Sequence, residues 1–259
     1  MNGRLLVFTD LDGTLLDHDS YDYRPALPAL HRLMGNGTPV IPVSSKTLAE
    51  LEIYCAELNL HGPAVAENGA AIRLPGEAPD IAAPGYARIC SLLAQWRAQQ
   101  GLQFRGFADM TVAEVVAHTG LPPESARLAR TRLASEPILW QDSDQALERF
   151  RELARTAGLR LLQGGRFLHL LGDMDKGRAV CRIVAWYRTQ GWQGITSLAL
   201  GDSGNDRDML LSVDIPVIIR KKDGSHLELP QRPDAIVTQL SGPAGWNQAI
   251  NGLLDSQGS

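Results

Sequence analysis

The 259-residue sequence has few cysteines and no long hydrophobic run, and each shortage excludes a class of protein. The three cysteines, Cys55, Cys90 and Cys181, are far apart and form no Cys-x-x-Cys pair, which argues against a disulfide framework and a zinc site. No stretch reaches the roughly 20 apolar residues of a membrane-spanning helix. The apolar run near the N-terminus is too short for a signal peptide. We therefore expect a cytoplasmic protein without a membrane partner.

The sequence also lacks an excess of positive charge. Its net charge is −4, which does not favour nucleic acid as a partner. An anionic substrate would instead need a local group of basic residues or a metal ion.

The sequence pattern predicts an α/β fold with a Rossmann-like, doubly wound parallel sheet. Strand-like and helical segments alternate over residues 5–73 and again from about residue 172, which is the rhythm of such a sheet. Between them, a linker rich in Pro, Gly and Ala (74–86) precedes a helical stretch at 86–100. The expected division is a core formed by residues 1–83 and 172–259, with an inserted α+β cap at 84–171.

Within the cap the pattern is less regular. Helical patterns cover 122–134 and 144–157, and strand candidates cover 137–140, 160–163 and 167–171. Arg127, Arg130 and Arg132 fall in the first of these helical patterns. A solvated helix face and a wall of the substrate pocket both remain open for them.

Polar residues gather where four predicted strands end. Ligands of a parallel α/β sheet bind at the carboxyl ends of its strands, so distant sets of residues converge there. The four sets are Asp10, Asp12, Gly13 and Thr14; Ser44, Ser45, Lys46 and Thr47; Asp173, Asp175 and Lys176; and GDSGND at 201–206.

These sets predict phosphoryl chemistry. One of Asp10 and Asp12 can attack while the other transfers a proton. Asp202 adds negative charge, so we expect Mg²⁺ to bridge Asp10, Asp202 and a phosphoryl oxygen. Ser44 can donate a hydrogen bond, and Lys176 can neutralise charge on the transferred group.

Each signal alone has a simpler interpretation. Asp-x-Asp occurs in ordinary turns, a single lysine is usually a surface residue, and GDSGND also fits a turn with a helix N-cap. The order of the sets and their placement at strand ends make the combination specific.

In that order, FTDLDGTLLD, the serine of VSSKT, DKG and GDSGND resemble the four motifs of the haloacid dehalogenase superfamily of phosphatases. The insert resembles the larger α/β cap of its Cof-like branch. More narrowly, PVSSKT, AENGAAI, GGRFLHL, MDKGRA, GDSGNDRDML and SGPAGWN resemble the family of mannosyl-3-phosphoglycerate phosphatases and their close relatives.

The resemblance implies a role for each motif residue. Asp10 is then the nucleophile that forms an aspartyl-phosphate, and Asp12 is the acid/base whose backbone carbonyl is also a metal ligand. Asp202 is the metal-binding carboxylate, so the implied metal set is Asp10, Asp12 and Asp202. Ser44 and Lys176 form the phosphoryl-binding pair, with Ser203, Asn205 and Asp206 in support.

Further residues are candidates for substrate binding. Lys46 and Arg166 are expected to hold a carboxylate or a second anionic group, and Glu67, Asn68 and His169 to hydrogen-bond sugar hydroxyls, with Ser45 beside them. Simpler interpretations stay open: a hairpin turn for Glu67 and Asn68, a solvated loop for Arg166, a core histidine for His169 and a strand-end cap for Lys46.

The expected activity is Mg²⁺-dependent hydrolysis of a glycosyl-3-phosphoglycerate, mannosyl or glucosyl, to the glycosylglycerate and phosphate, by a monomer or homodimer. In many members of the family, products of this kind act as compatible solutes. The alternatives are a broad sugar or nucleotide phosphatase, a phosphomutase with the same cap, and a non-catalytic anion-binding protein. The last is disfavoured because both Asp10 and Asp12 are present.

Overall fold

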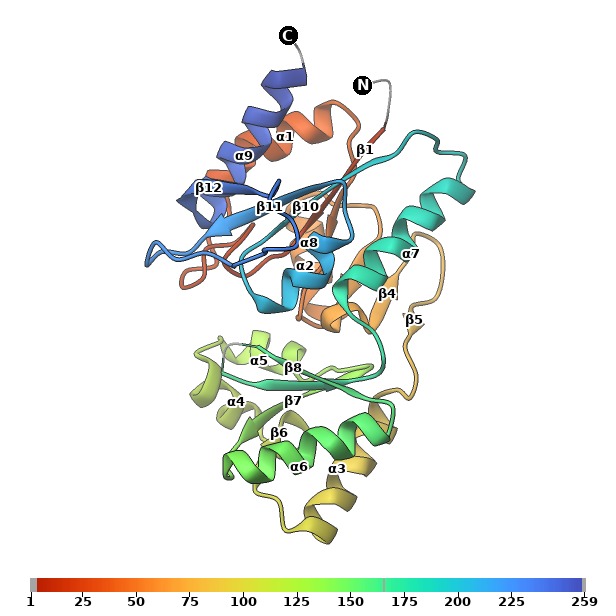
Figure 1. Cartoon of the computed structure of the whole chain (residues 1–259), viewed down its shortest axis with the longest axis vertical. Coiled ribbons are helices and arrows are strands. Elements are labelled where there is room, and N and C mark those ends of the chain that lie inside the picture. Colours follow the sequence, from red (N-terminus) through yellow and green to blue (C-terminus); the bar gives the residue numbers. More distant parts are fainter. Residues whose placement is uncertain (1–3, 165, 258–259) are drawn as a thin grey trace.

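A central parallel sheet forms the upper lobe of the molecule (Figure 1), a computed structural model that describes residues 4–164 and 166–257. Its five strands follow the order β12-β11-β10-β1-β2, and each neighbouring pair is parallel. This confirms the predicted doubly wound sheet. The strands are β1 (Leu5–Thr9), β2 (Val40–Pro42), β10 (Thr196–Gly201), β11 (Ile215–Arg220) and β12 (Ile236–Ser241).

Helices cover both faces of this sheet. Side chains alternate along a strand, so Val7 packs in the cluster on one face while Leu6 and Phe8 pack on the other. The Val7 face is covered by α1 (Leu27–Gly35), which follows the turn η1 (Arg24–Ala26), and by α2 (Leu48–Glu57) and α9 (Gly242–Gln257). The Phe8 face is covered by α7 (Lys176–Thr189) and α8 (Arg207–Leu211).

A small antiparallel sheet of β3 (Ala64–Ala66), β4 (Ala71–Arg73) and β5 (Asp80–Ile81) follows α2. The turn η2 (Glu67–Gly69) joins β3 to β4, as the Asn68-Gly69 pair predicts. Gly69 has a positive φ of 101°, and a side chain on it would collide with the backbone of Asp175. This hairpin therefore lies directly against the start of α7.

The lower lobe is built on a second, antiparallel sheet with the order β6-β7-β9-β8 (Figure 1). Helices α3 and α6 lie on its far side from the parallel sheet, and Trp96 of α3 and Phe150 of α6 belong to one core cluster. The elements are α3 (Tyr86–Gln100), β6 (Phe104–Gly106), η3 (Phe107–Asp109), α4 (Val112–Thr119), α5 (Pro123–Ala129), β7 (Ser135–Trp140), α6 (Asp144–Thr156), β8 (Arg160–Gln163) and β9 (Leu168–Leu171).

The lower lobe differs from the prediction in two ways. The helix expected over 122–134 ends at Ala129, so Arg132 lies beyond it and is not on a helix. In addition, β6, which is only three residues long, and α4 were not predicted. In the upper lobe, β12 was also missed.

The chain passes between the lobes at two neighbouring points. Gly172 lies so close to Ala83 that a side chain on it would strike the Ala83 carbonyl oxygen. The expected cap boundaries, at residues 84 and 172, therefore adjoin each other in space. Within residues 4–164 and 166–257, no helix combines the length and apolar character needed to cross a membrane.

Candidate active site

A cavity of about 700 Å³ lies between the carboxyl ends of β1, β10 and β11 in the upper lobe and strands β8 and β9 of the lower-lobe sheet. It brings together strand-end residues that are far apart in sequence. Its lining includes Asp10, Asp12, Gly13, Ser45, Asp202, Ser203 and Asn205 from the upper lobe, and Gln163, Gly164 and His169 from the lower lobe.

Asp10 follows β1 directly and is only 5% exposed. Its backbone amide donates to the Leu200 carbonyl of β10, and the preceding Thr9 hydroxyl accepts from the Trp246 indole, 3.0 Å away. Oδ1 of Asp10 accepts a hydrogen bond of 2.6 Å from the Lys176 ammonium, at the start of α7. Lys176 therefore lies at the end of β1 beside Asp10, and its predicted role in binding the phosphoryl group stays a prediction.

Asp10, Asp202 and Asp206 form a buried carboxylate cluster in which one oxygen of each lies within 4.8 Å of the others. Of the three carboxylates, Asp206 accepts the most hydrogen bonds. Its Oδ1 accepts from Lys176 at 2.6 Å, and its Oδ2 accepts from the backbone amides of Asp202 and Ser203, each at 3.0 Å. Asp206 therefore holds the loop after β10 in place, while Asp10 and Asp202 keep oxygens available to a ligand.

The pKa values in the cluster reflect burial and mutual repulsion. Burial, followed by the Asp206 carboxylate, raises the pKa of Asp10 well above its usual range. The same two causes raise the pKa of Asp202 to about 6. Burial would lower the pKa of Lys176, but Asp10 and Asp206 outweigh it and raise that pKa. The cluster thus holds more negative than positive charge, and a bound cation would reduce the repulsion among its carboxylates.

Asp12 makes a different contact from Asp10. Its Oδ1 lies 2.8 Å from the Lys46 ammonium, which also makes cation–π contacts with the rings of Tyr21 and Tyr54. Lys46 is only 8% exposed. We therefore replace its predicted contact with a substrate anion by an ion pair that orients Asp12.

Ser44 and Ser45 follow β2. Ser44 is fully buried, and its hydroxyl accepts from the backbone amide of Lys46 at 3.2 Å. Ser45 lines the cavity, and its carbonyl accepts from Arg132 of the lower lobe at 3.2 Å. The phosphoryl-binding role of Ser44 and the substrate contact of Ser45 stay predictions.

Three of the predicted residues form a polar link at the cavity edge. The Asn205 amide donates to Oδ1 of Asn68 at 3.1 Å, and the Ser203 hydroxyl donates to Oδ1 of Asn205 at 2.6 Å. This link ties the turn after β3 to the loop after β10. Asn68 is 1% exposed, so little of its surface is free for the predicted contact with a sugar hydroxyl.

Glu67 is fully buried and contacts the lower lobe rather than the cavity. Its carboxylate accepts from the backbone amides of Leu133 and Ala134, at 2.7 and 3.0 Å, and from the Ser135 hydroxyl at 2.7 Å. The Arg132 guanidinium lies 3.5 Å away. Because both oxygens are used, we replace the predicted sugar contact of Glu67 by a structural role between the lobes.

The two candidates near β9 are placed differently from each other. His169 lines the cavity, and burial, followed by the positive charges of Arg132 and Lys176, lowers its pKa to about 3. It is therefore uncharged at neutral pH. Arg166 is exposed, is not part of the lining, and donates to the His118 carbonyl. Its predicted role as an anion clamp is not supported by this position.

Sequence reasoning missed the last residue of β11 and the loop that follows it. Arg220, Lys221, Lys222 and Asp223 all line the cavity. The signal was available, because this polar run stands at the end of a strand just as the other sets do. The segment at Asp17, His18 and Asp19, which lines the cavity on the β1 side, was also missed.

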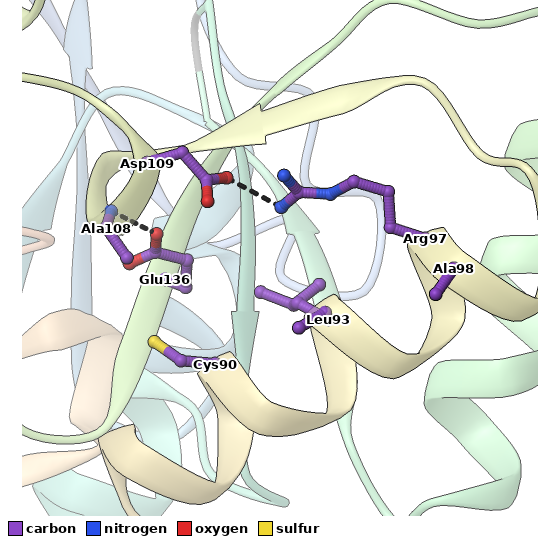
Figure 2. Close-up of a pocket in the computed structure, with 8 residues that line it drawn as sticks. Cys90, Leu93, Arg97, Ala98, Ala108, Asp109 and Glu136 are labelled. Atoms are coloured by element: carbon purple, nitrogen blue, oxygen red, sulfur yellow. Dashed lines mark hydrogen bonds and ion pairs between the residues drawn. The ribbon is translucent and has the colours of Figure 1, made fainter.

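A separate cavity of about 320 Å³ lies within the lower lobe, between α3 and the sheet (Figure 2). Burial raises the pKa of its Glu136 to about 7. Figure 2 shows that the polar groups here serve the fold: Glu136 accepts from the Ala108 amide at 2.7 Å, and Arg97 pairs with Asp109 at 2.6 Å. This cavity contains none of the strand-end residues.

Solved structures share this architecture across the whole chain. A protein from Thermoplasma acidophilum matches 98% of this chain and 99% of its own, with a TM-score of 0.72 and 18% identity. A phosphatase of the haloalkanoate (HAD) enzyme superfamily from Bacteroides thetaiotaomicron matches 96% of this chain and 95% of its own, with a TM-score of 0.72 and 17% identity. These likenesses establish the fold.

Sequence comparison establishes the family. Residues 7–86 match the haloacid dehalogenase-like hydrolases. A glucosyl-3-phosphoglycerate/mannosyl-3-phosphoglycerate phosphatase of Methanococcoides burtonii is 40% identical over 96% of this chain and 97% of its own length. A protein of the same name from Persephonella marina is 35% identical over 97% of each. The chain therefore belongs to the haloacid dehalogenase-like hydrolases, in the family that these two phosphatases represent.

Proposed function

We propose that the protein hydrolyses glucosyl- or mannosyl-3-phosphoglycerate to the glycosylglycerate and phosphate. The observation that carries the proposal is the buried cluster of Asp10, Lys176, Asp202 and Asp206, of which Asp10 and Asp202 line the 700 Å³ cavity. The names of two relatives aligned over nearly the whole chain support the substrate.

The arrangement supports a two-step mechanism. Oδ of Asp10 attacks phosphorus, the bond from phosphorus to the glyceryl oxygen breaks, and Asp12 gives that oxygen a proton. Asp12 then takes a proton from water, whose oxygen attacks the aspartyl-phosphate and releases phosphate while Asp10 is restored. Lys176 stabilises the charge on Asp10, and Lys46 holds Asp12 in position.

We further propose Mg²⁺ as the cofactor. The donors fit, since Asp10 and Asp202 offer hard carboxylate oxygens within 4.8 Å of each other, and the Asp12 backbone carbonyl follows Asp10 by two residues. When bound, the ion would offset the repulsion between the carboxylates and a phosphate group. A side chain on Gly13, whose φ is 79°, would come within 3.0 Å of Asp202, so glycine keeps this space open.

The substrate assignment is tested by measuring phosphate release from a panel of phosphate esters with Mg²⁺. We expect kcat/KM for the two glycosyl-3-phosphoglycerates to exceed that for hexose phosphates, nucleotides and 3-phosphoglycerate by about 100-fold or more. Similar low values across the panel would favour a broad-specificity phosphatase. Isomerised sugar phosphate in place of free phosphate would favour a phosphomutase.

Removal of divalent cations is expected to reduce phosphate release by about 100-fold or more, because the carboxylate cluster then repels the substrate. EDTA followed by desalting tests this, and added Mg²⁺ should restore the rate. Full activity after EDTA, with no response to Mg²⁺, would contradict the metal assignment.

Mg²⁺ affinity is expected to fall as the pH falls below about 6. Asp202 has a raised pKa of about 6, so it is protonated below that pH and must lose its proton to bind a cation. The apparent affinity should drop by about tenfold per pH unit in that range. Calorimetric titration of the protein with MgCl₂ between pH 5 and 7.5 measures this, and a constant affinity would exclude Asp202 as a ligand.

The domain division also stays a proposal. We propose that residues 84–171 form a cap that moves over the core, with 83–84 and 172 as the connections. The contact between Ala83 and Gly172 supports this, as does the separate core around Phe150. A cytoplasmic location and a monomeric or homodimeric state remain expectations from the sequence.

A further inference from the structure

Three consecutive basic residues, Arg220, Lys221 and Lys222, line the active-site cavity at the end of β11. Two of them are already engaged. Arg220 donates to the carbonyls of Thr238 and Gly224, at 3.1 and 2.6 Å. The ammonium of Lys222 lies 2.8 Å from Asp17 and 2.6 Å from Asp19. These contacts brace the loop against β12 and against the segment after β1.

Lys221 is different. Within residues 4–164 and 166–257, its ammonium makes no hydrogen bond or ion pair. Its backbone is nevertheless fixed, because its amide donates to the Ser225 carbonyl at 2.8 Å and its carbonyl accepts from the Gly224 amide at 3.0 Å. The side chain is exposed into the cavity, near enough to Asp202 for its charge to act on that carboxylate. The backbone of Lys221 is thus fixed, while its ammonium is free to bind an anion in the cavity.

The cavity needs such a cation. Its lining is rich in carboxylates, with Asp10, Asp12, Asp17, Asp19, Asp202 and Asp223 all contributing. The proposed substrate carries a carboxylate besides its phosphate, and an unpaired anion in this setting would be repelled.

The other candidates for that anion are unsuitable. Lys176 is shared between Asp10 and Asp206, and Lys46 is paired with Asp12. Arg166 is outside the lining, and His169 is uncharged.

We propose that Lys221 binds the glycerate carboxylate of the substrate and so determines specificity for phosphoglycerate esters. This rests on the proposed function. The carboxylate and the phosphate sit at the two ends of the three-carbon glycerate unit, so a phosphate at Asp10 leaves the carboxylate in the cavity that Lys221 also lines. The core lobe then reads the glycerate portion of the substrate, while the lower lobe contacts the sugar.

The test compares glucosyl-3-phosphoglycerate with its carboxyl methyl ester, which has no negative charge at that position. For Lys221→Ala we expect kcat/KM for the acid to fall about 10- to 100-fold, the size of a lost charged hydrogen bond. The value for the ester should change less than about twofold, because Lys221 has no anion to bind there. Lys221→Arg should recover part of the activity on the acid.

Arg155→Ala is the control, since it removes an exposed positive charge on α6, away from the cavity, and not the proposed contact. It should leave the acid-to-ester ratio of kcat/KM unchanged. Equal losses on acid and ester in Lys221→Ala, or no loss on either, would overturn the assignment of Lys221 and leave the proposed function intact. Absence of wild-type turnover of both glucosyl- and mannosyl-3-phosphoglycerate would overturn both proposals.

Discussion

Replacing Asp10 by asparagine is expected to reduce kcat for phosphate release by a factor of about 10⁴ or more. The amide has nearly the shape of the carboxylate but cannot attack phosphorus, so no aspartyl-phosphate forms. The loss should appear with every phosphate ester, because it removes the first chemical step and not a contact with one leaving group. Steady-state phosphate release with Mg²⁺ measures it.

Loss of folding would not explain such a result. Burial and the Asp206 carboxylate raise the pKa of Asp10 in the folded protein, so its ionised form costs stability at neutral pH. Without Mg²⁺, Asp10→Asn should therefore have a Tm equal to or above that of the wild type. Asp22→Asn, a change at a surface aspartate paired with Arg24, is the control and should keep full activity. More than about 1% residual turnover in Asp10→Asn would reject the nucleophile assignment.

The strand-end residues were predictable because their placement follows from local pattern and one topological rule. Apolar runs mark β1 and β10, polar residues follow each run, and parallel strands bring their carboxyl ends to one edge. Asp10, Lys176, Asp202 and Asp206 met there as the sequence predicted.

The roles of Lys46 and Glu67 were not predictable in the same way. Lys46 was expected to hold an anionic group of the substrate, and Glu67 to hydrogen-bond a sugar hydroxyl. Their partners, Asp12 and the 133–135 segment, are distant in sequence, and the pairing depends on how the loops and lobes pack. Nothing in the periodicity of either segment encodes such a contact.

One missed helix did carry a local signal. Thr111 and Glu114 have the Ser/Thr-x-x-Glu spacing of a capping box, and α4 begins with that motif: Thr111 accepts from the Glu114 amide, and Glu114 accepts from the Thr111 amide at 2.7 Å. The missed strand β6 had no comparable signal. Its three residues pair with β7, and that pairing is set by the sheet as a whole.

The buried carboxylate of Glu67 leads to the second large effect, which concerns stability. Glu67→Ala is expected to lower the free energy of unfolding by about 3–5 kcal/mol, because it leaves buried donors and the Arg132 charge without their acceptor. The donors are the amides of Leu133 and Ala134 and the Ser135 hydroxyl. For a chain of this size the loss corresponds to a fall in Tm of roughly 6–20 °C.

Thermal unfolding at neutral pH measures this, with Glu228→Ala as the control. The side chain of Glu228 is 86% exposed, so its removal should change stability by less than about 0.5 kcal/mol. Glu67 connects the β3–β4 hairpin of the core to the 133–135 segment that leads into β7. Because it anchors one lobe to the other, Glu67→Ala should also lower activity on glycosyl-3-phosphoglycerates, whose sugar we propose that the lower lobe contacts. A Tm equal to that of the Glu228→Ala control would show that the two lobes hold together without this carboxylate.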